Sequence, residues 1–189
     1  MAYPVNYDAA LSCLVDSYRK GGKLLLCGNG GSSADCAHIV GELVKGFLKK
    51  RPLSDELCEK IGQPWAKQLQ QGLPAIDLTC HSALLSAVCN DLDAANIYAQ
   101  QVLAYGVEGD VLIGISTSGN AENVFRACVA AKAKGMHVIA LTGQSGGRLR
   151  EVCDCLLNVD ETETYKVQEK HLQVYHKLCA DVEEAFFPR

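Results

Sequence analysis

The chain has 189 residues, of which 48% are hydrophobic, so it is long enough to bury the core of one domain without disulfide or metal support. Its net charge is -4 and it carries no block rich in Lys and Arg, which argues against nucleic acid or an acidic membrane as a direct partner. No apolar stretch approaches the roughly 20 residues that span a bilayer, and the N-terminus lacks a signal-peptide pattern, so we expect a cytoplasmic protein.

Strands and helices are expected to alternate along the chain. In chain order, the apolar pattern predicts a helix (6–20), a strand (23–27), a helix (33–47), a strand (74–79), two helices (82–90, 95–105), a strand (110–116), a helix (121–134), a strand (136–142), a short helix after 147, a strand (155–159) and a last helix (164–186). Five strands separated by helices imply a parallel sheet covered on both faces. We therefore predict one α/β domain over residues 1–189.

The segment 53–72 interrupts this alternation. It is polar, contains Pro64 and Trp65, and offers Ser54 as an N-cap for one amphipathic helix with a short apolar stripe at Leu57 and Ile61. We interpret it as a surface insertion that acts as a lid.

Four cysteines outside this segment lie among aliphatic residues, namely Cys27, Cys89, Cys128 and Cys179. Free thiols in such surroundings behave as small hydrophobic side chains. We expect these four in the core.

Two strands end in turns that suit a phosphate group. An apolar run stops at Gly28-Asn29-Gly30-Gly31-Ser32, and a second one stops at Ser116-Thr117-Ser118-Gly119-Asn120, each time before a helix. Glycines allow a close backbone approach, and a helix N-terminus favours an anion. Neither turn matches a P-loop or a dinucleotide fingerprint, so we expect a phosphorylated ligand and no nucleotide cofactor. The alternative is that the glycines only form tight turns.

Titratable residues gather on two of the predicted helices. His38 and Glu42 are four residues apart and share a helical face, which predicts either a site near the first turn or a solvated surface pair. The last helix carries Gln168, His171 and His176, which are acid/base candidates or incidental polar residues.

One further polar pair follows an apolar stretch. Asn90 and Asp91 would hold sugar hydroxyls or simply cap a helix.

Together these motifs, with Leu141-Thr142-Gly143 and Gln168-Glu169-x-His171, resemble the sugar isomerase (SIS) domain family and, within it, the phosphoheptose isomerases. The resemblance covers about 21–187. It implies a flavodoxin-like three-layer αβα sandwich and a homotetramer with active sites at subunit interfaces. It also implies an aldose-ketose isomerase that converts sedoheptulose 7-phosphate to D-glycero-D-manno-heptose 7-phosphate.

The resemblance also assigns roles to residues. The substrate pocket would be lined by Asn29, Gly30, Gly31, Ser32, Asn90, Asp91 and Gln168, with Ser116, Thr117 and Ser118 holding the phosphate. Glu42 would move a proton between C1 and C2 through an enediol, and His176 would handle the oxygen protons. Some members carry zinc, and the matching ligands would be His38, Glu42, Gln168 and His176. On a straight helix, Gln168 and His176 are separated by about 12 Å, which makes shared ligation difficult.

The chain departs from the family pattern in three places. Ala121 stands where a phosphate-binding serine is usual, the segment before Gly21 is short, and 53–72 is extra. Two other functions therefore stay open: a non-catalytic scaffold resembling the DnaA initiator-associating protein, and a phosphosugar sensor. Scaffolds of this kind lose the catalytic pair, whereas this chain keeps Glu42 and His176.

Overall fold

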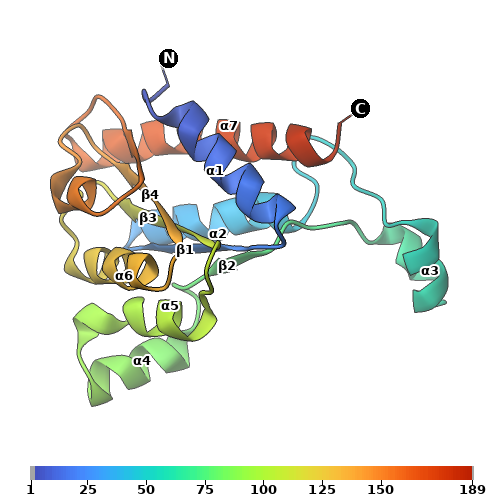
Figure 1. The fold of residues 1–189 in the computed structure, drawn as a ribbon, viewed down its shortest axis with the longest axis horizontal. Helices are drawn as coiled ribbons and strands as arrows, with labels where there is room; N and C mark the ends of the chain where they lie inside the picture. The colour runs from blue at the N-terminus through green and yellow to red at the C-terminus, as the bar shows by residue number, and fades with distance from the viewer. Residues whose placement is uncertain (1–2, 189) are drawn as a thin grey trace.

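A five-stranded parallel sheet forms the centre of the molecule in the computed structural model, which describes residues 3–188 (Figure 1). The strands are β1 (Leu24–Gly28), β2 (Ala75–Asp77), β3 (Val111–Ser116), β4 (His137–Thr142) and β5 (Cys155–Asn158). Their order is β2-β1-β3-β4-β5, with every neighbouring pair parallel. This is the flavodoxin-like order, so the expected fold class is confirmed.

Helices cover both faces of the sheet (Figure 1). One face carries α1 (Tyr7–Arg19), α2 (Gly31–Val44) and α7 (Thr164–Phe186), and the other carries α5 (Ala99–Tyr105) and α6 (Glu122–Ala133), with α4 (Ser82–Asp91) outside them. Strand β1 is buried throughout because its side chains pack against the helix layers on both faces of the sheet. Leu24 and Leu26 point into the first core, while Leu25 and Cys27 point into the second.

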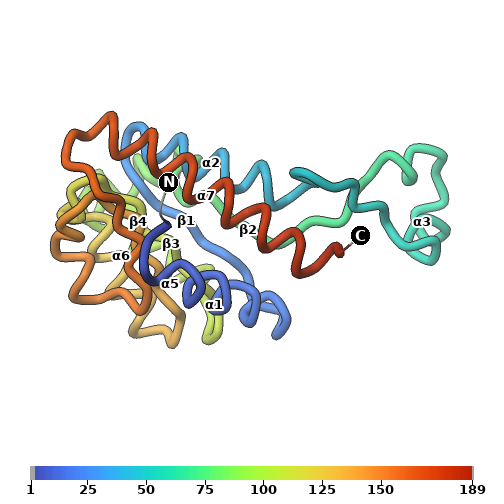
Figure 2. The backbone as a smooth tube through the Cα atoms, turned by 90° about the horizontal axis from the view of Figure 1, so that it is seen from above, coloured from blue at the N-terminus to red at the C-terminus, as the bar shows by residue number. Residues whose placement is uncertain are grey.

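Short 3-10 helices complete the described elements: η1 (Pro64–Gln68), η2 (Ala94–Asn96) and η3 (Gly147–Glu151). Within residues 3–188, no helix has the combined length and hydropathy that a membrane crossing requires. Helices α2 and α7 lie side by side along one face (Figure 2). This pairing brings residues from the two ends of the chain together.

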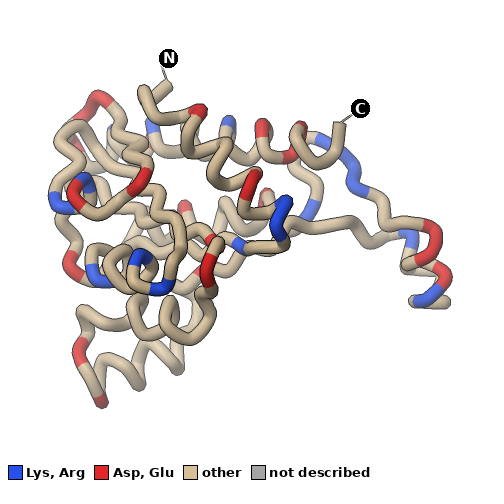
Figure 3. Tube along the Cα trace, viewed as in Figure 1, with Lys and Arg blue, Asp and Glu red and all other residues tan. Residues whose placement is uncertain are grey.

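The segment 53–72, here called the projecting arm, extends away from the sheet (Figure 1). It forms α3 (Asp55–Ile61) and η1 rather than the single helix that we expected. Ser54 does cap α3, since its hydroxyl accepts the Leu57 amide at 3.3 Å. Gly62 then adopts a left-handed conformation with φ 66° and Pro64 follows, which ends the helix. None of the α3 residues is buried, and both charge signs line this end of the molecule (Figure 3).

A buried ion pair fastens the base of the arm to α7. Glu183 is 1% exposed and accepts the amides of Phe47 and Leu48 at 2.9 and 2.7 Å, together with Arg51 Nε at 2.8 Å. Arg51 is also 1% exposed and donates to the Leu43 carbonyl at 2.7 Å. Helix α2 consequently ends at Val44, three residues earlier than expected, because the following backbone turns to reach Glu183.

Two residues lie where the sequence pattern did not place them. Cys89 is exposed, because α4 lies outside the layer that packs on the sheet, so its expected core position is wrong. His171, one of the acid/base candidates, is fully buried on the sheet side of α7. Burial lowers the pKa of His171 to about 4, and the Thr142 backbone acts in the opposite direction.

Candidate functional site

The two glycine-containing turns line one pocket of about 380 Å³ at the carboxyl ends of β1 and β3. Its lining residues are Asn29, Gly30, Gly31, Ser32, Ile115, Ser116, Thr117, Ser118, Ala121, Thr164 and Gln168. None of these described residues is charged, so an anion here would be held by hydroxyls, amides and the N-terminus of α2. Of the predicted substrate-binding residues, all except Asn90 and Asp91 line this pocket.

Glycine is required twice in the first turn. Gly30 precedes α2 with φ 57°, a conformation that residues with a side chain rarely adopt. Gly31 begins α2, and a Cβ there would lie 2.4 Å from the Gln168 amide nitrogen. The absence of a side chain at position 31 therefore lets α7 approach the turn closely.

The Asn29 side chain connects the first turn to α6, the helix that follows the second turn. Its amide donates to Asn123 Oδ1 at 2.8 Å, and Asn123 donates back at 3.0 Å from the first turn of α6. The Tyr98 hydroxyl also donates to the Gly28 carbonyl at 2.7 Å. Asn29 thus links the first turn to the start of α6, a role that the sequence pattern did not indicate.

A second cluster of polar side chains lies where α2 and α7 pack together. His38 Nε2 is 3.2 Å from Glu42 Oε1 on α2 and 3.4 Å from His176 Nε2 on α7. The Phe47 ring covers His176 with ring centres 5.5 Å apart, and Lys45 lies 3.3 Å from the other Glu42 oxygen. Glu42 and His176, the predicted catalytic pair, therefore both lie beside His38 within a single chain. The His38 side chain is 41% exposed, so the surface-pair alternative for His38 and Glu42 stays open.

The His176 imidazole is suited to accept a proton. Burial lowers the pKa of His176 below its usual value, the neighbouring His38 adds to this effect, and Glu42 opposes it. The ring is consequently neutral at pH 7.

The nitrogen and oxygen donors of this cluster are of the types that bind zinc, and some of the distances between them fit a zinc site. Ligand atoms around a tetrahedral Zn²⁺ lie about 3.3 Å apart, which the separations from His38 Nε2 to Glu42 and to His176 match. As they stand, however, the His, Cys, Asp and Glu side chains of residues 3–188 include no group of three arranged to hold a metal ion. Gln168 lies against Gly31, eight residues before His176 on α7. The cluster thus fits zinc as a partial set of ligands, and the four-ligand set stays a prediction.

Asn90 and Asp91 lie apart from both groups. They end the exposed helix α4, and the Asn90 amide donates to Asp91 at 2.7 Å. Neither is among the described residues that line the pocket. A role for this pair in a site requires a contribution from another copy of the chain.

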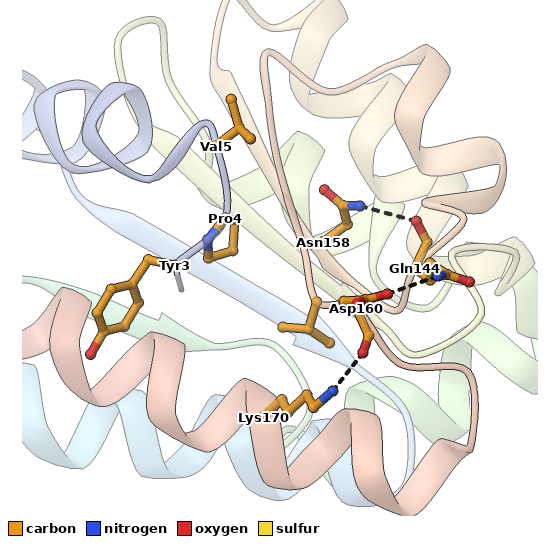
Figure 4. Close-up of a pocket in the computed structure, with 8 residues that line it drawn as sticks. Tyr3, Pro4, Val5, Gln144, Asn158, Asp160 and Lys170 are labelled. Carbon is orange, nitrogen blue, oxygen red and sulfur yellow. Dashed lines mark hydrogen bonds between the residues drawn. The ribbon is translucent and has the colours of Figure 1, made fainter. Parts of the chain in front are cut away.

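Another pocket of about 400 Å³ lies beside the ends of β4 and β5 (Figure 4). Its polar groups already bond to each other: Asn158 donates to the Gln144 carbonyl at 3.0 Å, and Gln144 donates to Asp160 at 2.8 Å. Lys170 donates to the Asp160 carbonyl. A ligand would find fewer free polar atoms here than between the two turns. The pocket between the turns is therefore the candidate site.

Comparison with known proteins decides the family. A family model described as the SIS domain matches residues 5–71 and 70–143. The chain is 44% identical over 173 residues to a phosphoheptose isomerase of Burkholderia pseudomallei (strain K96243), which covers 92% of this chain and 78% of that protein. The chain belongs to the SIS domain family.

Solved structures agree with this membership. The SIS domain chain matches a phosphoheptose isomerase from Francisella tularensis with a TM-score of 0.82 and 34% identity over 97% of this chain and 87% of that one. A phosphoheptose isomerase from Neisseria gonorrhoeae matches with a TM-score of 0.79 and 35% identity, over 94% and 85% of the two chains. The resemblance drawn from the motifs is confirmed.

Several residues of the SIS domain site were missed by the sequence analysis. They are Asp35, Tyr98, Asn123, Thr164 and Tyr175, which line the pocket or bond to residues of the two groups. Thr164 begins the last helix and Tyr175 precedes His176, so proximity in sequence was an available signal for both. No periodicity indicates Tyr98 or Asn123, because their contacts join distant parts of the chain.

Proposed function

We propose that this chain is an aldose-ketose isomerase of sugar phosphates that converts sedoheptulose 7-phosphate to D-glycero-D-manno-heptose 7-phosphate. The relatives named phosphoheptose isomerase support this substrate. The single structural observation that carries the proposal is that Glu42 Oε1 and His176 Nε2 lie 3.2 and 3.4 Å from His38 Nε2, on two helices that also contribute to the pocket between the turns.

The proposed mechanism assigns the phosphate to the turns and the proton transfers to the cluster. Thr117 and Ser118 would donate hydroxyl hydrogen bonds to the phosphate at one end of an extended sugar. Glu42 would take the proton from C1 of the ketose, form an enediol, and return the proton to C2. His176, neutral at pH 7, would move the proton between the oxygens on C1 and C2. The net result moves the carbonyl group from C2 to C1.

Zinc forms part of the proposal. His38, Glu42 and His176 would hold the ion, with Gln168 as the fourth predicted ligand. When bound, the ion would polarise the sugar carbonyl as a Lewis acid.

The proposed assembly is a homotetramer with sites at the subunit interfaces, acting in the cytoplasm, where phosphorylated sugars are retained by their charge. Two observations support the assembly. Asn90 and Asp91 lie on an exposed helix, and the nearby Leu92 and Leu103 are 61% and 50% exposed. A neighbouring copy would cover such apolar side chains and receive the polar pair. Light scattering on the purified chain measures the assembly directly.

Incubation of the chain with sedoheptulose 7-phosphate, followed by NMR detection of the aldose, tests the function. Unphosphorylated sedoheptulose is the matched control, because it removes only the group that the turns would bind. We expect aldose from the phosphorylated ketose alone, with turnover lost to a chelator and restored by Zn²⁺. Tight binding without aldose formation would instead favour the phosphosugar sensor or the scaffold.

A further inference from the structure

The motif Leu141-Thr142-Gly143 ends strand β4 and takes no part in the proposed mechanism, yet it contacts the second of the two glycine-containing turns. The Gly143 N–H donates to the Thr117 carbonyl at 2.9 Å. A Cβ at position 143 would lie 2.6 Å from that carbonyl oxygen, 3.0 Å from the Glu161 carbonyl and 3.1 Å from Val167 on α7. The first two neighbours are backbone atoms, which cannot rotate away as a side chain can. Glycine at this position therefore lets the end of β4 approach the turn closely.

The loop after β4 donates another hydrogen bond to the same turn. The Leu149 N–H donates to the Gly119 carbonyl at 3.0 Å. None of the described residues 143–149 lines the pocket, whereas Thr117 and Ser118 do. The loop therefore supports the turn from the side that faces away from the pocket.

The hydrogen bond from Gly143 sets the direction of one peptide group in the turn. The peptide bond between Thr117 and Ser118 is trans, so its C=O and its N–H point in opposite directions. Because the Thr117 carbonyl faces Gly143, the Ser118 N–H faces the opposite side, where the pocket lies. This N–H donates to no group within residues 3–188. It is therefore free to donate to a bound anion, and hydrogen bonds to charged acceptors are among the strongest.

We propose that Gly143 is a positioning residue for phosphate binding, which holds the Thr117–Ser118 peptide so that the Ser118 N–H points into the pocket. This inference rests on the proposed function only in taking the pocket between the turns as the phosphate site. Gly143 acts through the turn and does not itself line the pocket. The motif that ends β4 thereby contributes to the same site as the two turns.

The change Gly143→Ala tests the inference through ligand affinity. The added methyl group would press on the Thr117 carbonyl and turn the peptide group away from its present direction. We expect the Kd of inorganic phosphate, measured by calorimetry, to rise by about 10- to 100-fold, the range for one hydrogen bond to a charged group. The matched control is Gly41→Ala, because a Cβ at this exposed helical position would meet no atom within 4 Å. The control should bind phosphate as wild type does.

Kinetics separates positioning from a general loss of structure. With sedoheptulose 7-phosphate, Gly143→Ala should raise KM by about 10- to 100-fold and leave kcat nearly unchanged, because the groups that transfer protons lie elsewhere. A partly unfolded population would instead lower the apparent kcat at constant KM. An unchanged Kd for phosphate together with an unchanged KM in Gly143→Ala overturns the inference.

NMR of the wild-type chain gives a readout that needs no variant, so it holds even if Gly143→Ala does not fold. Gly143 is the only glycine preceded by threonine, and Gly106 is the only one preceded by tyrosine. Labelling glycine with ¹⁵N, and the carbonyl of threonine or tyrosine with ¹³C, therefore isolates the amide signal of each.

Inorganic phosphate should shift the Gly143 signal, because an anion bound to the Ser118 N–H polarises the whole peptide group that Gly143 contacts. The Gly106 signal should stay in place, since this residue precedes β3 at the opposite edge of the sheet. A Gly143 signal that phosphate does not move overturns the inference. A chain that shows the shift and the weakened binding yet forms no aldose retains the inference and loses the proposed function instead.

Discussion

The pocket between the two turns and the His38–Glu42–His176 cluster both include residues of α2 and α7. The two regions nevertheless form in different ways. Most residues of the pocket are consecutive ones at the ends of two neighbouring strands, and only Thr164 and Gln168 come from α7, so the shape of the pocket is largely a local property of each turn. The cluster joins residues more than 130 positions apart in the sequence, and it exists only where α2 and α7 pack together.

The difference also appears in charge. Polar but uncharged residues line the pocket, where a helix N-terminus supplies the positive end of a dipole. The cluster combines two imidazoles with a carboxylate and a nearby lysine, and the Tyr175 hydroxyl lies 2.9 Å from His38 Nδ1. We infer that the pocket determines affinity for the phosphate and that the cluster determines the rate of proton transfer.

Replacing the Glu42 carboxylate should have the largest effect of these changes. It distinguishes the role of the cluster from the role of the pocket. Glu42→Gln should lower kcat by about 10²- to 10⁴-fold, because an amide cannot take the proton from C1. Binding of sedoheptulose 7-phosphate, measured by calorimetry, should stay largely intact. The control Glu169→Gln changes an exposed carboxylate on α7. Unchanged turnover in Glu42→Gln would refute the role of the cluster.

The converse change removes a hydroxyl from the pocket. Thr117→Val keeps the side-chain shape but deletes a donor to the phosphate, so KM should rise by about 10- to 100-fold while kcat changes little. Steady-state kinetics with the phosphorylated ketose measures both constants, with Thr162→Val in an exposed loop as the control. A fall in kcat at constant KM would mean that the two regions are not separable.

His171 lies on α7 between the pocket and the cluster. Changing it tests whether this part of the helix contributes only to stability. Its folded pKa of about 4 lies below the usual value near 6.5, so the unfolded chain takes up a proton that the folded chain excludes. Stability should therefore fall by up to about 3 kcal/mol as the pH drops from about 6.5 to 4. Urea unfolding of His171→Leu should show a flatter dependence over that range, whereas the exposed His137→Gln should behave as wild type.

Shortening the projecting arm should have the smallest effect. Pro52 pairs with Gln70, and the Gln71 backbone N–H donates to the Arg51 carbonyl at 2.7 Å, so a glycine linker that replaces 54–69 would keep the paired base. We expect a melting temperature within a few degrees of wild type, because Ala66 of η1 is the only buried residue within 54–69 and α3 buries none.

Kinetics on the shortened chain would show which region the arm serves. The proposed lid role predicts a changed KM for the sugar phosphate and unchanged binding of inorganic phosphate. A large loss of thermal stability would point instead to a core or interface role for the arm.

Much of the fold could be predicted because the signals were local. The predicted bounds of the last helix, 164–186, agree with α7, and the five strands were placed within one or two residues. Errors arose where local patterns competed. Gly62 and Pro64 divided the expected helix of the arm, and Cys89 resembled a core residue on a helix that lies outside the core.

The candidate site was predicted unevenly for the same reason. The pocket between the turns could be predicted because the glycine and hydroxyl residues of each turn are adjacent in the sequence. His38 and Glu42 could be paired by helical spacing, but whether His176 lay beside them depended on the register of α7 against α2.

The sequence by itself determined the alternation of strands and helices, the two glycine-containing turns and the family, since these follow from neighbouring residues and their periodicity. Only the tertiary structure decided that His176 meets His38, that Tyr175 bonds to both Asp35 and His38, and that Asn90 and Asp91 lie away from the pocket. The physical reason is that hydrogen bonds between side chains act over about 3 Å, and packing alone brings residues so distant in the chain within that range.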